Sequence, residues 1–268
     1  METIINVENL TCLVGNNAIL SNINWNIKKG DHWVVFGLNG SGKTTLLSIL
    51  AGYRGYTSGS VTVFGTPYTK QNILEKRKRI GWISSSFYDK YYTKESILQI
   101  VLAGVTGKLG VNGSITNADV KKAKYLLTEL GLAEKMNRTF DLLSKGERQS
   151  VLIARELMTN PEILILDEPG TGLDIYARER MLSLVRTLSQ NPDITIIYVT
   201  HYTEEILDIF DQCLLLKNGR VYAKGKTTEL FQEETVSEFL DAPAQIKIVD
   251  GSYYIGMTDA AQIMLEQE

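Results

Sequence analysis

Cysteine and histidine are scarce in this sequence, which holds two of each in 268 residues. Cys12 and Cys213 lie far apart in the chain and show no metal-binding spacing. We therefore exclude a disulfide scaffold and expect a reducing compartment. His32 and His201 are also widely separated, so a zinc site built mainly from cysteine and histidine is not expected.

Long apolar runs and an excess of one charge are missing too. The longest apolar stretches, residues 97–105 and 163–166, are well short of the roughly 18 residues that a membrane-spanning helix needs. The first residues show no basic segment followed by an apolar core, so we expect no signal peptide. A formal net charge of −3 argues against direct nucleic-acid binding. We expect a cytoplasmic protein that reaches the inner face of the plasma membrane only through a partner.

What the chain does contain is an alternation of short strands and helices. Trp33–Phe36 and Ile163–Leu166 are unbroken apolar runs of the kind found in buried strands. This alternation predicts an α/β fold with parallel strands that are covered on both faces. The other expected elements are helices at about 147–158 and 175–189, a strand at 194–199, and a helix from about Glu204.

Two further regions differ from this alternating pattern. Residues 23–27 and 61–63 alternate between apolar and polar side chains, which predicts half-buried strands. Residues 87–158 carry helical stripes at 94–104 and 117–130. We interpret this second region as an inserted helical subdomain.

The end of the chain has a pattern of its own. Apolar residues flank Asp250 and Gly251, which predicts a hairpin. We therefore expect a main domain over residues 1–240 and an extension over residues 241–268. The extension is expected to form this hairpin and a short helix.

Residues 37–44, GLNGSGKT, match the phosphate-binding pattern G-x-x-x-x-G-K-[ST]. The loop follows an apolar strand and opens a helical stripe, so a plain glycine-rich turn is the weaker interpretation. Its backbone N–H groups can point at phosphate oxygens, and Lys43 would reach the β and γ phosphates. The Thr44 hydroxyl would ligate Mg²⁺. The expected ATP-binding residues are Gly37, Leu38, Asn39, Gly40, Ser41, Gly42, Lys43, Thr44 and Thr45.

Two acids follow the apolar run 163–166. Carboxylates at the end of a buried strand are costly unless they have a task, and ligands bind at the carboxyl ends of parallel strands. Asp167 would hold Mg²⁺, directly or through water, and Glu168 would polarise the attacking water. The alternative is an ordinary strand-end turn before Pro169.

Together with three further pieces, these motifs resemble the ATP-binding cassette (ABC) ATPases. In chain order the pieces are GLNGSGKTT, LSKGE, ILILDEP, GLD and VTH, and the resemblance covers roughly residues 3–230. Within the family, the chain is similar to single-cassette bacterial proteins with GWxSSS and LSxGE runs, often labelled molybdate- or iron-type transport ATPases. The resemblance implies a RecA-like P-loop NTPase core, an antiparallel β subdomain and an inserted helical subdomain. It also implies ATP hydrolysis by two copies that face head to tail around two ATP molecules.

The resemblance assigns residues 144–147 to the signature that contacts the ATP held by a facing copy. These residues are Ser144, Lys145, Gly146 and Glu147. On their own, Ser144 and Glu147 have the spacing of a capping box that opens a helix. The two interpretations are compatible, because a capped helix start presents N–H groups and a favourable dipole to a phosphate.

Two more residues take roles from the resemblance. His201 would be the switch histidine, which binds the γ-phosphate and orders the water together with Glu168. Asp174 would shape the dimer interface, although its position also suits a helix N-cap. His32 lies at a loop-to-strand junction and is interpreted as structural.

The sequence departs from the family at two positions. Val14 stands where the family often has an aromatic residue that stacks on adenine, so we expect weaker selection between ATP and GTP. Ser85 stands where the family usually has a glutamine that contacts Mg²⁺ and senses the membrane partner. A serine is too short for that contact except through a water, so Ser85 is a doubtful metal residue.

Two groups of residues near Ser85, one aromatic and one basic, each allow two interpretations. The aromatic residues that follow it form either a partner-docking patch or part of the core. The basic run 76–79 is expected to be a solvated face, with a phosphate or RNA contact as the alternative. The aromatic residues are Phe87, Tyr88, Tyr91 and Tyr92.

The main hypothesis is the ATP-binding subunit of an ABC transporter, acting as a homodimer with a separate integral membrane permease. The alternative is a soluble ABC ATPase for repair, translation or regulation that acts on a non-membrane partner. A nucleotide-binding module without turnover is disfavoured by Glu168 and His201.

Overall fold

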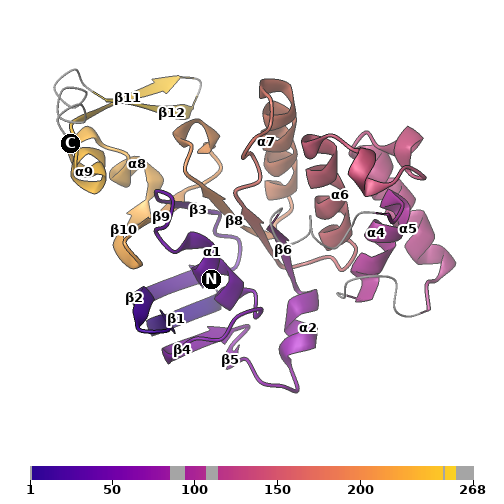
Figure 1. Cartoon of the computed structure of the whole chain (residues 1–268), viewed down its shortest axis with the longest axis horizontal. Coiled ribbons are helices and arrows are strands. Elements are labelled where there is room, and N and C mark those ends of the chain that lie inside the picture. Colours follow the sequence, from indigo (N-terminus) through magenta and orange to yellow (C-terminus); the bar gives the residue numbers. More distant parts are fainter. Residues whose placement is uncertain (1, 85–93, 107–113, 250, 258–268) are drawn as a thin grey trace. The chain divides into compact units, whose positions relative to one another are not determined.

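The computed structural model describes residues 2–84, 94–106, 114–249 and 251–257 (Figure 1). The chain divides into two compact units. Unit 1 joins residues 1–67 to residues 196–268, and unit 2 is the intervening stretch 68–195. In the part of the chain that the structure describes, no helix is long and apolar enough to cross a membrane.

Unit 1 contains an antiparallel sheet. Its strands, in spatial order, are β2 (Asn17–Lys28), β1 (Thr3–Val14), β4 (Ser58–Val63) and β5 (Thr66–Pro67) (Figure 1). Ile23, Trp25 and Ile27 on β2 are buried, and the residues between them are more exposed. The alternation that predicted strands at 23–27 and 61–63 therefore also decides which face of the sheet is buried.

Unit 1 also holds a group of parallel strands. β3 (Trp33–Phe36) lies between β8 (Thr195–Thr200) and β9 (Gln212–Lys217) and runs parallel to both. β10 (Arg220–Lys226) pairs with β9 in the antiparallel sense. All four residues of β3 are buried, as its unbroken apolar sequence predicted.

After β8 the chain makes one short turn, η4 (Thr203–Glu205). The helix expected from about Glu204 is therefore wrong. Apolar residues do recur at helical spacing beyond this turn, but Ile206 adopts extended backbone angles and ends it. The buried carboxyl of Glu205 is hydrogen-bonded to Thr200 and Tyr198 on β8, which holds the turn against the end of that strand.

The last part of unit 1 contains helices α8 (Thr227–Leu230) and α9 (Glu233–Leu240), then strands β11 (Ala244–Val249) and β12 (Ser252–Met257). The two strands pair in the antiparallel sense, so the predicted hairpin is confirmed. Tyr253 on β12 is buried and packs on Phe231 with ring centroids 4.9 Å apart. The short helix expected after the hairpin lies outside the described residues.

Unit 2 combines two parallel strands with helices. β6 (Ile80–Ser84) and β7 (Ile163–Asp167) are buried along their whole length. The longer helices are α4 (Ile97–Ala103), α5 (Asn117–Glu129), α6 (Lys145–Leu157) and α7 (Ile175–Ser189), and α4, α5 and α6 contact one another. The shorter ones are α2 (Ile73–Lys78), η1 (Gly104–Thr106), η2 (Ala133–Lys135) and η3 (Phe140–Leu142). All four longer helices match predicted ones, and α4 starts later than expected because Ser96 caps it in a capping box with Gln99.

The basic run 76–79 forms the expected solvated face only in part, because the side chains of Lys78 and Arg79 are 42% and 46% exposed but Lys76 is not. Lys76 is buried, with 6% of its surface exposed, and its ammonium lies 5.1 Å from the centre of the Tyr68 ring. Burial, and next the charge of Arg79, lower the pKa of Lys76. Arg79 itself forms an ion pair with Glu162, in which Nη2 and Oε2 are 3.0 Å apart. Lys76 is therefore packed within unit 2, and the alternative of a phosphate or RNA contact at the exposed residues stays a prediction.

The turn between β9 and β10 connects three parts of unit 1. Asn218 and Gly219 both have left-handed backbone angles, with φ of 50° and 71°. The Gly219 N–H donates to the Ser41 carbonyl oxygen at 3.0 Å, and the Gly219 carbonyl accepts from the Ser21 N–H at 2.8 Å. A hairpin turn thus joins the loop of residues 37–44 to strand β2.

We expect Gly219→Ala to weaken ATP binding as well as folding. A left-handed alanine costs about 1–2 kcal/mol, and its Cβ would also collide with the Ile19 carbonyl oxygen. Gly65→Ala is the matched control, because Gly65 has a φ of 76° after Phe64 at 51° and nothing within 4 Å of its Cβ position. Urea unfolding should show a loss for both variants and a larger one for Gly219→Ala. Only Gly219→Ala should need more fluorescent ATP analogue for half-saturation, and equal affinities would contradict the link.

Candidate functional site

In unit 1, the loop between β3 and α1 (Lys43–Leu50) has the geometry of a phosphate cradle. Gly42 precedes α1 with a φ of 101°, which only glycine adopts at low cost, and β2 lies directly against it. Lys43 is 4% exposed, and its Nζ donates to the carbonyl oxygens of Gly37 at 2.8 Å and Leu38 at 3.2 Å. Thr44 is exposed in the first turn. The loop therefore offers a buried ammonium, a helix start and an accessible hydroxyl.

In unit 2, the end of β7 carries the two acids. Asp167 is the last residue of the strand and is 5% exposed, and Glu168 is half-buried just beyond it. Glu168 has a φ of 52°, a left-handed conformation that costs a residue other than glycine about 1–2 kcal/mol. Such strain is concentrated at functional sites, and nothing in the sequence reveals it. The residue predicted to polarise the attacking water thus lies at a strained position directly after β7.

His201 follows β8 in unit 1 and is held from both sides. The Thr200 Oγ1 donates to the Glu205 carboxyl at 2.7 Å and accepts from the Tyr202 N–H at 2.9 Å. The rings of His201 and Tyr202 are 4.1 Å apart, centre to centre. The Thr200 hydroxyl therefore bonds to both the Tyr202 backbone and the Glu205 side chain, and this fixes the chain around His201.

Glu205 is a residue that the sequence analysis missed. Its side chain is fully buried, and Oε2 accepts hydrogen bonds from Thr200 and from the Tyr198 hydroxyl, the latter at 3.1 Å. A buried carboxyl is costly unless it is hydrogen-bonded, so this group fixes the segment that carries His201. The signal in the sequence is an acid directly before the apolar pair Ile206 and Leu207.

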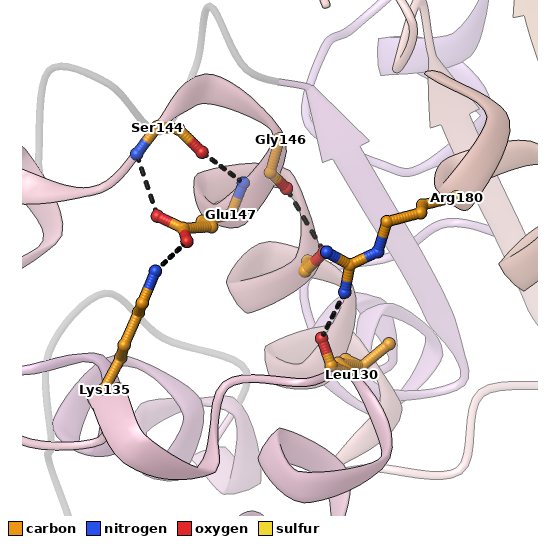
Figure 2. A network of polar contacts seen from close by, with 7 residues as sticks. Leu130, Lys135, Ser144, Gly146, Glu147 and Arg180 are labelled. Atoms are coloured by element: carbon orange, nitrogen blue, oxygen red, sulfur yellow. Dashed lines mark hydrogen bonds and ion pairs between the residues drawn. The ribbon is translucent and has the colours of Figure 1, made fainter. Parts of the chain in front are cut away.

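In unit 2, the signature begins α6, and its capping box is confirmed. The Ser144 Oγ accepts from the Glu147 N–H, and the Glu147 carboxylate accepts from the Ser144 N–H at 3.0 Å (Figure 2). The second carboxylate oxygen of Glu147 forms an ion pair with Lys135. Partial burial acts to raise the pKa of Glu147, but the hydrogen bonds from Lys135 and Ser144 outweigh it and hold the pKa below its usual range.

The start of α7 lies beside the signature. Asp174 caps α7 by accepting from the Ala177 N–H at 2.8 Å, so the N-cap prediction is confirmed. The same Ala177 leaves no room for a side chain at Gly146. A groove of about 570 Å³ opens between the two helix starts and the turn at residues 129–132. Arg180 lines this groove and donates to the Leu130 carbonyl oxygen at 3.5 Å (Figure 2).

The predicted site residues are thus distributed over both units. The loop at residues 37–45 and His201 belong to unit 1, whereas Asp167, Glu168, Asp174 and the signature belong to unit 2. Ser85 and the aromatic residues Phe87, Tyr88, Tyr91 and Tyr92 lie outside the described residues.

Three residues outside these motifs have the following environments. Val14, at the position of the adenine-stacking aromatic, is 47% exposed at the end of β1. His32 accepts a hydrogen bond from the Ile196 N–H at its Nδ1, which supports the structural interpretation. Both cysteines are free and buried, and burial strongly raises the pKa of Cys213.

Comparison with known proteins identifies the family. A family model described as ABC transporter matches residues 20–171, more than half of the chain. The chain belongs to the ABC transporter family. Among the relatives of this ABC cassette, the uncharacterized ABC transporter ATP-binding protein YlmA of Bacillus subtilis (strain 168) is 39% identical over 245 residues. That match covers 91% of this chain and 93% of the relative.

Solved ABC structures share the fold. The cbiO1 protein from Clostridium perfringens, part of the ABC transporter complex cbiONQ, has a TM-score of 0.75 and 29% identity, over 90% of this chain and 95% of that one. The dimeric, post-hydrolysis MJ0796 cassette bound to ADP and Pi has a TM-score of 0.73 and 26% identity, over 83% and 98%. The predicted RecA-like P-loop fold and ATPase activity of this ABC cassette are confirmed.

We expect Tyr198→Phe to destabilise the ABC cassette by about 1–3 kcal/mol, because it removes a hydroxyl donor from a fully buried carboxyl. Tyr222→Phe is the matched control, since its hydroxyl also contacts a glutamate, Glu238, at 3.1 Å but at an exposed site. Urea unfolding should show a clear loss for Tyr198→Phe and little change for Tyr222→Phe. Equal effects would mean that the Glu205 carboxyl does not depend on this hydrogen bond.

Proposed function

We propose that this chain is the ATP-binding subunit of an ABC transporter. In this proposal, ATP binding closes a head-to-tail pair of copies, and hydrolysis reopens it. The observation that carries the proposal is that one chain holds both a phosphate cradle, around Lys43, and a separate capped helix start, at Ser144. In a head-to-tail pair, each ATP would lie between the cradle of one copy and the signature of the other. The solved MJ0796 cassette is dimeric with ADP and Pi bound, which supports the pairing of two copies.

Each site residue has a distinct task in this proposal. Lys43 and the N–H groups of residues 37–45 bind the β and γ phosphates. His201 binds the γ-phosphate and, with Glu168, orders and polarises the attacking water. Asp174, which caps α7 beside the signature, shapes the interface with the second copy.

Mg²⁺ would be held by Thr44 and Asp167. The exposed Thr44 hydroxyl and the Asp167 carboxylate are oxygen donors of the hard type that Mg²⁺ prefers. When bound, the ion neutralises charge on the phosphates. Ser85, the doubtful metal residue, and the weaker selection against GTP expected from Val14 stay predictions.

The second part of the proposal is a separate integral membrane permease. The named relative is an ABC transporter ATP-binding protein, and cbiO1 is part of a transporter complex. Through such a permease the protein would be held at the cytoplasmic face of the plasma membrane. The alternative, a soluble ABC ATPase, draws on the glutamate at the end of the signature and is less well supported.

We expect Glu168→Gln to lower ATP turnover by at least about 100-fold, because it removes the general base. The same variant should still bind ATP and should form a dimer when ATP and Mg²⁺ are added. The tests are a phosphate-release assay and light scattering after size exclusion. Glu234→Gln is the control, because Glu234 is an exposed acid on α9 outside every motif, and it should leave turnover unchanged. Normal turnover in Glu168→Gln would refute the assignment of the base.

Capture of the partner tests the transporter hypothesis directly. Tagged Glu168→Gln protein, purified from its own cells in detergent with ATP, should retain an integral membrane protein. The same capture without ATP serves as the control. Recovery of ribosomes, nucleic acid or soluble proteins alone would favour the soluble alternative.

A further inference from the structure

The signature of this chain has a charge in an unfavourable place. Glu147 lies in the first turn of α6, at the helix start that would contact the triphosphate of a facing copy. A helix start attracts anions through its N–H groups and its dipole. A carboxylate at the same place opposes a phosphate by like-charge repulsion, so its charge must be compensated if ATP is to bind there.

Lys135 supplies that compensation from another element. It is the last residue of η2, and its ammonium forms an ion pair with one carboxylate oxygen of Glu147. The other oxygen accepts from the Ser144 N–H, so both oxygens are engaged (Figure 2). The side chains of Lys135 and Glu147 are only 32% and 26% exposed, which limits screening of their attraction by water.

The neighbouring cations have other contacts. Arg148 donates to the Asp141 carbonyl oxygen at 2.8 Å and lies over the Phe140 ring. The Lys145 ammonium lies against Gly172. Among the described residues, Lys135 is the cation that forms an ion pair with Glu147.

We propose that Lys135 is a positioning residue for the signature, which neutralises Glu147 and holds its carboxylate in the capping box. The start of α6 then remains favourable to the triphosphate of the facing copy. This inference rests on the proposed function, because it requires the signature to act across a dimer. It adds a residue outside the signature itself.

The test is a double-mutant cycle in the Glu168→Gln protein, with ATP-driven dimerisation as the measurement. Lys135→Met should raise the ATP concentration for half-maximal dimerisation on the order of tenfold, because it exposes an uncompensated carboxylate beside the phosphate. When Glu147→Gln is already present, Lys135→Met should cause no further loss, since a neutral glutamine needs no counter-charge. Lys135→Arg should retain dimerisation close to the parent.

Two further measurements separate positioning from a general loss of structure. Lys121→Met, an exposed lysine on α5, should leave dimerisation unchanged. ATP binding to the monomer should be equal in the parent and in Lys135→Met, because the phosphate loop belongs to unit 1.

Several results would overturn the inference. No effect of Lys135→Met, or an equal loss with and without Glu147→Gln, would refute the charge-compensation role while leaving the proposed function intact. Failure of the Glu168→Gln parent to dimerise with ATP would overturn the proposed function and this inference together.

Discussion

A lysine ammonium that is almost completely buried sets the main constraint on unit 1. Lys43 can be accommodated only if oxygen atoms surround its Nζ, and the carbonyl groups of Gly37 and Leu38 provide them. The loop must therefore curl over the start of α1, which places Gly42 in a left-handed conformation against β2. The turn at Gly219 then ties the loop to the rest of the unit. Folding and phosphate binding depend on the same geometry.

In the signature in unit 2, the same residues likewise serve both the fold and the proposed contact with ATP. In the capping box the N–H groups of Ser144 and Glu147 are bonded without any ligand, which stabilises the start of α6. The same capped start is what a phosphate would meet. A capping box therefore does not compete with a role in ATP binding, but it does bring a negative charge that another element must offset.

Local patterns predicted most of the fold. β3 is four buried residues in an apolar run of four, and α7 begins at the residue after its Asp174 cap. Such elements depend on neighbouring residues, and their signals are visible in one stretch of sequence. The motif residues were found for the same reason, because each motif is short and continuous.

The features that the sequence could not predict depend on side-chain contacts between different elements or on backbone strain. Lys76 is buried with its ammonium near the Tyr68 ring, and the Glu205 carboxyl bonds to β8 where η4 ends. The left-handed backbone of Glu168 has no sequence signal at all. The ion pair between Lys135 and Glu147 joins the short turn η2 to helix α6. Lys135 belongs to no motif, so the sequence motifs alone do not predict this pair.

Three glutamates show how environment assigns different tasks to one side chain. Glu205 is fully buried and accepts hydrogen bonds from two hydroxyl groups, so its carboxyl fixes the segment around His201. Glu147 is partly buried and paired with a lysine, so its charge is compensated and its role is to cap a helix. Glu168 is half-buried at a strained strand end, in a setting unlike those of Glu205 and Glu147. The strained backbone fixes where this side chain lies, which fits the water-polarising role that we propose for Glu168.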